Sequence, residues 1–214
     1  MTIPSSTPCP DRRVRLLAVA GALLLGALAG RAGAQQSPRD VVQTTSDQVI
    51  AVLSQKDLSK EQRREQVKRI VLANTDFDTL CRLVLARNWN SFTPEQQAEF
   101  KREFEDHLSA TYGRRLDDYR NEKIAIVGDR KEANGDVTVQ TRLLRGGGSN
   151  DFVVDYRLRQ SNGQWKVIDM IPEQVSLVAN FRSQFQEILS NGGPEKLLQV
   201  LREKTAKGEE FKSS

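Results

Sequence analysis

The sequence predicts an α+β fold in which helices pack on the concave face of a four-stranded, curved antiparallel sheet. Two changes in hydrophobic period support this prediction. Apolar residues recur every three or four positions from residue 38 to residue 119, which indicates helices. They alternate from residue 123 to residue 171, which indicates strands, and the helical period returns after Pro172. Runs of helices followed by a run of strands are typical of the α+β class.

The N-terminal helices are marked by their caps. Ser37 precedes Pro38, a residue that favours the first helical position. Ser59 with Gln62, and Thr93 with Gln96, have the spacing of capping boxes. A shorter apolar helix is expected over residues 76–89. After Thr93, one stripe predicts a single long helix of about 25 residues; it consists of Phe100, Phe104, Leu108, Tyr112, Leu116 and Tyr119.

The strands are bounded by turn residues. The four expected strands cover residues 123–129, 136–144, 151–160 and 164–171. The segment "RGGGSN" at 145–150 is interpreted as a hairpin connection, because no helix with a Lys-Ser/Thr pair follows it as in a phosphate-binding loop. Pro172 ends the last strand. A helix over 173–190, a stop at "NGGP", a final helix with Leu197 and Leu201, and a polar tail at 207–214 are expected to follow.

The N-terminus has the pattern of a cleaved signal peptide. Basic residues precede the apolar run at 16–29, and "AGA" at 32–34 fits a cleavage site before Gln35. We expect export to the periplasm of a bacterium, with both the general secretory and the twin-arginine routes left open. Residues 35–206 are then expected to form a single domain, because no repeat or clear linker interrupts them.

Charge and cysteine content exclude several classes of function. The full chain has 32 basic and 28 acidic residues, but four arginines and one aspartate lie in residues 1–34. The remaining part is nearly neutral, which argues against a nucleic-acid-binding surface. Beyond residue 34 the chain has one cysteine, Cys81, expected to be buried, and one histidine, His107, expected to be exposed or at a rim. No disulfide or zinc site is therefore expected, and no cofactor.

Two long segments resemble a known family. "DFDTLCRLVLARNWNSFTPEQQAEFKREFEDHLSATYG" and "WKVIDMIPEQVSLVANFRSQF", followed by "GGPEKLLQVLREK", resemble the MlaC or toluene-tolerance family. This family is the periplasmic phospholipid-binding component of the Mla (maintenance of lipid asymmetry) ABC transport system. The resemblance covers roughly residues 37–206. Ala86 and Gln174 stand where the family commonly has glycine, and Cys81 stands where it commonly has a small residue such as alanine.

The resemblance implies a fold with an apolar cavity and a carrier without catalysis. Such a protein, expected to be monomeric, would carry phospholipid between an outer-membrane lipoprotein complex and an inner-membrane complex of a lipid-binding ring protein and an ABC transporter. The expected lipid-binding residues share the inward side of the sheet or the facing helix stripe. They are Leu85, Trp89, Tyr112, Leu116, Tyr119, Val139, Phe152, Val154, Tyr156, Trp165, Val167, Val175 and Val178.

Three alternatives remain open from the sequence. The cargo could be another lipid, such as a hopanoid. An isomerase or dehydratase would need an acid or base in the pocket, for which Asp169, with Tyr156 as proton donor, is the candidate. The competing interpretation is an aspartate paired with an arginine or capping the turn before Pro172. An adaptor protein with a filled core is the third. Arg82, Arg87, Arg114 and Arg115 could pair with a headgroup phosphate, but are better explained as solvated helix faces.

Overall fold

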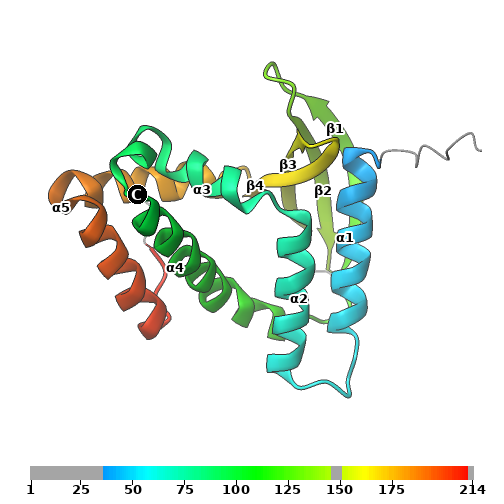
Figure 1. Cartoon of the computed structure of the whole chain (residues 1–214). Helices are drawn as coiled ribbons and strands as arrows, with labels where there is room; N and C mark the ends of the chain where they lie inside the picture. Colours follow the sequence, from blue (N-terminus) through cyan, green and yellow to red (C-terminus); the bar gives the residue numbers. More distant parts are fainter. Residues whose placement is uncertain (1–35, 146–150, 212–214) are drawn as a thin grey trace, which may run out of the picture. The chain divides into compact units, whose positions relative to one another are not determined.

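The computed structural model describes residues 36–145 and 151–211, which belong to one compact unit starting at Gln36. The expected signal peptide and most of the hairpin connection at 145–150 lie outside the described residues. Within the described part, no helix is long and apolar enough to cross a membrane. The α+β prediction is confirmed: helices come first, a four-stranded antiparallel sheet follows, and a helical segment closes the chain (Figure 1).

The observed elements follow the predicted order closely. The N-terminal helical segments are α1 (Pro38–Leu53), α2 (Lys60–Asn74), α3 (Phe77–Leu85), the 3₁₀ helix η1 (Ala86–Ser91), α4 (Pro94–Tyr112) and the 3₁₀ helix η2 (Gly113–Asp118). The strands are β1 (Lys123–Lys131), β2 (Val137–Leu144), β3 (Phe152–Ser161) and β4 (Gln164–Pro172), and α5 (Leu177–Lys207) ends the fold. Capping boxes at Ser59 and Thr93 are present as predicted, and Ser37 forms a further one with Asp40.

The sheet is a simple meander in the order β1-β2-β3-β4, and α1 lies against it (Figure 1). Val41 and Val42 of α1 pack with Val139 of β2 and Leu158 of β3 in a first core cluster. One irregularity matters for the site. The register shifts between Val167, opposite Leu158, and Asp169, opposite Arg157, so a β-bulge lies at this point of β4.

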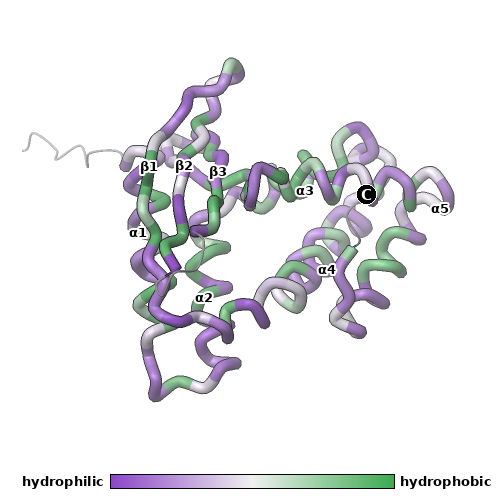
Figure 2. Tube along the Cα trace, turned by 180° about the vertical axis from the view of Figure 1, so that it is seen from behind, coloured by the Kyte–Doolittle hydropathy of each residue, from purple (hydrophilic) through white to green (hydrophobic). Residues whose placement is uncertain are grey.

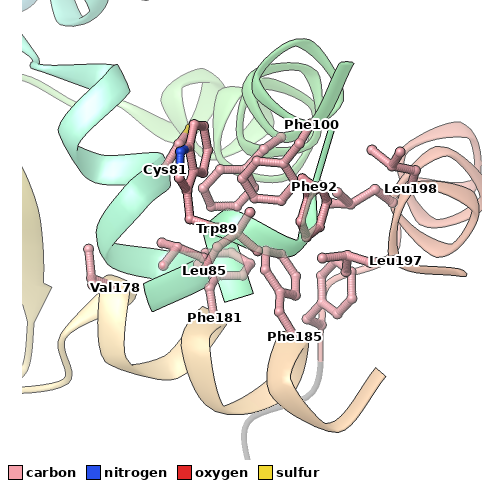
Figure 3. Packing of buried hydrophobic residues seen from close by; sticks show 14 residues of the cluster. Cys81, Leu85, Trp89, Phe92, Phe100, Val178, Phe181, Phe185, Leu197 and Leu198 are labelled. Carbon is pink, nitrogen blue, oxygen red and sulfur yellow. The ribbon is translucent and has the colours of Figure 1, made fainter. Parts of the chain in front are cut away.

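A second core cluster joins α3, α4 and α5. Phe100 and Phe185 are fully buried there, and Figure 3 shows them packed in this cluster with Phe181. Phe104 is also fully buried, and its ring meets that of Phe181 edge to face at 5.0 Å. Cys81 is buried in the same cluster, as predicted. Figure 2 shows both hydrophilic and hydrophobic residues along α4, which agrees with the apolar stripe predicted for this helix.

Three boundaries differ from the sequence prediction. The long stripe does not form one regular helix, because α4 ends at Tyr112 and continues as η2. The closing helix begins at Leu177 rather than at residue 173. Glu173 and Gln174 adopt positive φ angles of 45° and 66°, a conformation that excludes helix there. The expected stop at "NGGP" appears as a kink at Gly193, where φ is 67°.

The C-terminal segment is not simply a polar tail. After the αL cap at Gly208, the chain turns back and places Phe211 against Phe185 at a ring distance of 5.1 Å. Phe211 is buried, and Arg115 forms an ion pair with Glu210 at 2.5 Å. The only apolar residue of the segment thus completes the second core cluster.

His107 corrects another prediction, because its side chain is fully buried between α4 and α5 rather than exposed. Its ring meets Phe211 at 4.9 Å, and its Nδ1 lies 3.3 Å from the hydroxyl of Thr205. Burial, with a smaller contribution from the charge of Lys204, lowers the pKa of His107 to about 4. The residue therefore packs as a neutral ring in the core.

This burial predicts a pH-dependent stability. A histidine in the unfolded chain titrates near pH 6.5, so the unfolded state gains a proton between about pH 6.5 and 4 that the folded state does not bind. Stability should therefore fall as the pH drops through this window, by about 1.5–2 kcal/mol between pH 7 and pH 5. Urea unfolding at both pH values should show that His107→Leu lacks this part of the loss. An equal pH dependence in both proteins would contradict the neutral, buried histidine.

Ala86 gives a second stability prediction. It caps α3 with φ 49° and ψ −125°, a conformation that strains any residue except glycine by roughly 1–3 kcal/mol. Ala86→Gly should therefore stabilise the protein by about 1 kcal/mol, after the greater flexibility of glycine in the unfolded chain is subtracted. The matched control, Ala98→Gly in the exposed interior of α4, should destabilise it by about 0.5–1 kcal/mol in the same urea titration. Loss of stability in both variants would show that Ala86 is not strained.

Candidate functional site: an open apolar cavity

A cavity of about 600 Å³ lies between the two core clusters. All of α1 to α5, the 3₁₀ helix η2 and the strands β1, β3 and β4 contribute to its wall. Its volume is in the usual range for sites that hold a small molecule, about 300–1,000 Å³. The structure therefore has an open space at this place between the clusters.

The wall is predominantly apolar. Helices α1 to α5 contribute most of its residues, and β1, β3 and β4 contribute residues from the sheet. The apolar wall residues are Val42, Val49, Val67, Val71, Leu72, Phe77, Leu80, Val84, Phe104, Leu108, Tyr112, Leu116, Ile124, Tyr156, Val167, Met170, Leu177, Val178 and Phe181. Burial raises the pKa of Tyr156 to about 12, so its hydroxyl stays protonated at neutral pH.

The cavity opens between α2 and α4. Helix α2 packs mainly against α1 and η2 rather than against α4. On the α2 side, the wall residues Glu61, Glu65 and Val71 are exposed, and Val71 exposes 44% of its surface. Glu105 and Ser109 face them from α4. We call this region the opening; it is bounded by Glu61, Arg64, Glu65, Lys68 and Val71 of α2 and by Glu105 and Ser109 of α4.

Ion pairs cross the opening. Lys68 of α2 contacts Glu105 at 2.8 Å and Asp106 at 3.5 Å, both on α4. Arg64 of α2 donates two hydrogen bonds to Asp117 of η2, from Nε to one carboxylate oxygen at 3.0 Å and from Nη2 to the other. The hydrogen bond that Lys68 donates to Glu105 raises the pKa of Lys68, and the one that Asp117 accepts from Arg64 lowers the pKa of Asp117. The Lys68 pairs link α2 to α4, two helices that share little direct packing.

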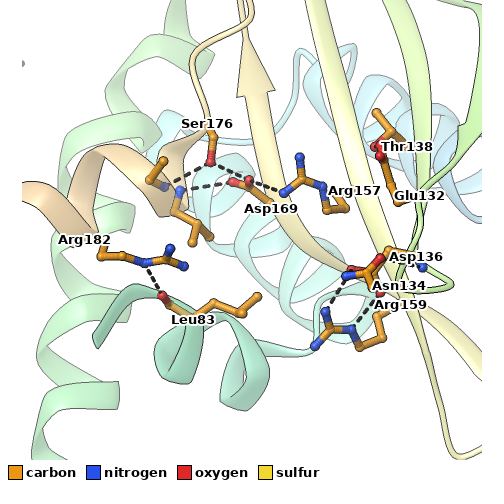
Figure 4. A network of polar contacts seen from close by, with 12 residues as sticks. Leu83, Glu132, Asn134, Asp136, Thr138, Arg157, Arg159, Asp169, Ser176 and Arg182 are labelled. Carbon is orange, nitrogen blue, oxygen red and sulfur yellow. Dashed lines mark hydrogen bonds and ion pairs between the residues drawn. The ribbon is translucent and has the colours of Figure 1, made fainter. Parts of the chain in front are cut away.

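Asp169 lines the cavity but is fully engaged by its neighbours (Figure 4). One carboxylate oxygen accepts from Ser176 Oγ at 2.6 Å and lies 3.6 Å from Arg157. The other accepts from the backbone N–H of Val178 at 3.1 Å. The bulge in β4 puts Asp169 opposite Arg157 instead of in the row of Trp165 and Val167. The pairing of Asp169 with an arginine is thus confirmed, whereas the turn that it caps is the first turn of α5, after Pro172, and not the turn before Pro172.

The structure places the predicted lipid-binding residues in different surroundings. Five of them line the cavity: Tyr112, Leu116, Tyr156, Val167 and Val178. The other eight do not. Leu85 and Trp89 belong to the second core cluster, and Val139 and Trp165 to the first. Phe152, Val154 and Tyr119 are partly buried elsewhere, while Val175 is 53% exposed in the turn before α5.

Several wall residues were missed by sequence reasoning. Most lie on α1 to α4, as do Val42, Val49, Leu72, Leu80 and Leu108. Val42 and Val49 share one helical stripe, which was a usable signal for an inward face. None of the four arginines considered for a headgroup lines the cavity. The basic residues at the opening are instead Arg64 and Lys68.

The described residues contain no cluster of three potential metal ligands. Burial raises the pKa of the Cys81 thiol strongly, so the thiolate needed for nucleophilic chemistry is disfavoured. The cavity therefore provides apolar surface inside and charged side chains at its opening.

The fold and the cavity together define a cavity-bearing α+β protein. The solved structure of a phospholipid-binding protein from Ralstonia solanacearum, in complex with a phospholipid, is similar with a TM-score of 0.71 and 28% identity, over 78% of this chain and 96% of that one. Toluene tolerance protein ttg2D of Pseudomonas putida is 26% identical over 75% of this chain and 76% of its own length. The intermembrane phospholipid transport system binding protein MlaC of Haemophilus influenzae is 23% identical over 77% and 80%.

The MlaC protein family model matches residues 43–203. Because this match covers most of the chain, the protein belongs to the MlaC family. The resemblance inferred from the sequence is therefore confirmed.

The contacts of Asp169 predict a structural role. Asp169→Ala would leave the Val178 N–H and Arg157 without their buried acceptor, and should lower the free energy of unfolding by about 2–4 kcal/mol. As the control, Asp129→Ala removes an exposed pair with Arg39 and should change it by less than about 1 kcal/mol. Urea unfolding measures both. Equal, small effects would leave Asp169 free for another role.

Proposed function

We propose that the protein is a periplasmic phospholipid carrier that binds acyl chains in the cavity and catalyses no reaction. The observation that carries the proposal is the open apolar cavity of about 600 Å³ in a member of the MlaC family. The phospholipid complex of the similar Ralstonia solanacearum protein supports the choice of ligand. By the family resemblance, the carrier would exchange lipid with an outer-membrane lipoprotein complex and with an inner-membrane ring protein and its ABC transporter.

The free energy of hydrating acyl chains explains why an apolar cavity alone is enough to carry a lipid. Each methylene transferred out of water contributes about 0.8 kcal/mol, so about thirty methylenes of a diacyl lipid would cost roughly 24 kcal/mol to expose. Free diffusion through water is therefore negligible. A membrane interior and an apolar cavity are both dry, so transfer between them can be nearly neutral. The carrier needs no reactive group, and direction must come from its partners.

Among the predicted lipid-binding residues, we assign acyl contacts to Tyr112, Leu116, Tyr156, Val167 and Val178, which line the cavity. Leu108 and Val42 extend this surface on α4 and α1. Catalysis through Asp169 is disfavoured because its carboxylate already holds Ser176, Val178 and Arg157.

The test is native mass spectrometry of the exported protein, purified without detergent, followed by lipid extraction. We expect one or more diacyl phospholipids to remain bound. Leu108→Trp, which fills the cavity from α4, should weaken the affinity for lipid roughly ten-fold, equivalent to about 1.4 kcal/mol, and so lower the bound fraction. Val127→Trp, at an exposed position of β1, is the matched control and should keep its lipid.

Either of two results would change the proposal. A different co-purified lipid, such as a hopanoid, would keep the carrier and replace the cargo. A ligand-free mass that persists after incubation with phospholipid vesicles would overturn the carrier function.

A further inference from the structure

Two basic side chains at the opening, Arg64 and Lys68, lie where a lipid headgroup could bind. Arg64 and Lys68 are four residues apart and therefore on one face of α2. Both line the cavity, and their side chains are 31% and 25% exposed. Val71 and Leu72, on the next turn, also belong to the wall. A phosphate held by Arg64 and Lys68 would thus have its acyl chains directed along apolar surface.

We infer that Arg64 and Lys68 bind the lipid phosphate and that the carboxylates around them select a zwitterionic headgroup over an anionic one. This inference rests on the proposed carrier function and specifies its substrate. We count the described charged groups at the opening together with those that form ion pairs there. Five are acidic and three are basic, so their net charge is −2. They are Glu61, Glu65, Glu105, Asp106 and Asp117, and Lys60, Arg64 and Lys68.

The present ion pairs allow this exchange. The side chains of Lys68 and Glu105 remain 25% and 32% exposed, so water screens their ion pair in part and reduces its contribution to stability. A phosphate offers Arg64 a two-armed contact like the one it now makes with Asp117, and offers Lys68 a second anionic oxygen. The lipid phosphate can therefore replace carboxylates without leaving either cation unpaired.

The carboxylates provide the selectivity. Once phosphate occupies the two cations, Glu105 and Asp117 lose their closest partners and remain near the headgroup. Glu65 is exposed beside them, and no ion pair to it is recorded among the described residues. The ammonium group of a zwitterionic lipid would be attracted to these carboxylates within a screening length of about 8–10 Å. An anionic lipid would add a charge to an opening that is already negative.

The other arginines near the opening do not reverse this balance. Arg115 lies over the ring of Tyr112, a wall residue, but it is paired with Glu210 at 2.5 Å. Arg114 donates to the backbone oxygen of Ala110 and is not part of the wall. Arg157 lies at the other side of the cavity and pairs with Asp169.

The experiment offers the exported protein vesicles with equal amounts of phosphatidylcholine and phosphatidylglycerol of the same acyl composition, and counts the lipids bound after re-isolation. At low salt we expect phosphatidylcholine to exceed phosphatidylglycerol about three- to five-fold, with the ratio approaching one at high salt. Lys68→Gln should lower total bound lipid severalfold. Glu65→Gln and Glu105→Gln should each move the ratio toward phosphatidylglycerol.

Matched controls separate this effect from a general change of surface charge. Lys101 and Asp78 form a comparable ion pair between α4 and α3 but do not line the cavity. Lys101→Gln and Asp78→Asn should therefore leave both the bound amount and the ratio unchanged. Glu65→Gln changes an exposed helical side chain, so it keeps the test valid if a variant of a paired residue fails to fold.

The outcomes are distinct. Bound lipid with a ratio near one, unaffected by Glu65→Gln and Glu105→Gln, would overturn the headgroup inference and leave the carrier function intact. A preference for phosphatidylglycerol would also overturn it. No bound lipid in the unaltered protein would contradict the carrier function itself.

Discussion

The structure depends on the separation of its apolar residues into two cores that do not merge. Val42, Val139 and Leu158 hold α1 on the sheet, while Phe104 and Phe185 join α4 to α5. Residues of both cores face the cavity between them, including Val42 and Phe104. A compact chain normally fills such a space to crystal-like density. Here each core is complete in itself, so the facing surfaces can stay apart without unfolding either.

Polar contacts maintain this separation at the edges of the cavity. Asp169 links β4 to the first turn of α5 through Ser176 and Val178, and Arg182 of α5 donates to the backbone oxygen of Leu83 in α3 at 2.8 Å (Figure 4). On the far side, Lys68 joins α2 to α4 through Glu105. The Asp169–Val178 and Arg182–Leu83 contacts are directional hydrogen bonds to backbone groups, and they fix the position of α5 relative to the sheet and α3.

Much of the fold followed from local sequence signals. The caps at Ser59 and Thr93 and the alternation in the strands have local causes, so they are readable without tertiary information. The helix start at Leu177 was missed because Glu173 and Gln174 occupy left-handed conformations that their residue types do not suggest. The family pattern gave a hint: a glycine is common at Gln174 and at Ala86, and both residues have positive φ.

The candidate site was less predictable, for a physical reason. An inward-facing apolar residue can meet either another side chain or empty space, and its hydrophobicity is the same in both cases. Val139 and Tyr156 both point inward from the sheet, yet only Tyr156 lines the cavity. The bulge in β4 changed the partner of Asp169, and the return of Phe211 to the core buried His107. Both depend on contacts between distant parts of the chain.

The weak anchoring of α2 has a consequence for the range of cargo. This helix contributes a single buried side chain, Val67, whereas α5 contributes seven. Displacing α2 outward therefore disturbs far less packing than displacing any wall of the aromatic core. The cavity is thus bounded on one side by the densely packed aromatic core and on the other by α2, which is packed less extensively. In the proposed carrier, a bulkier acyl chain would require the movement of this single helix, and the two cores would keep their packing.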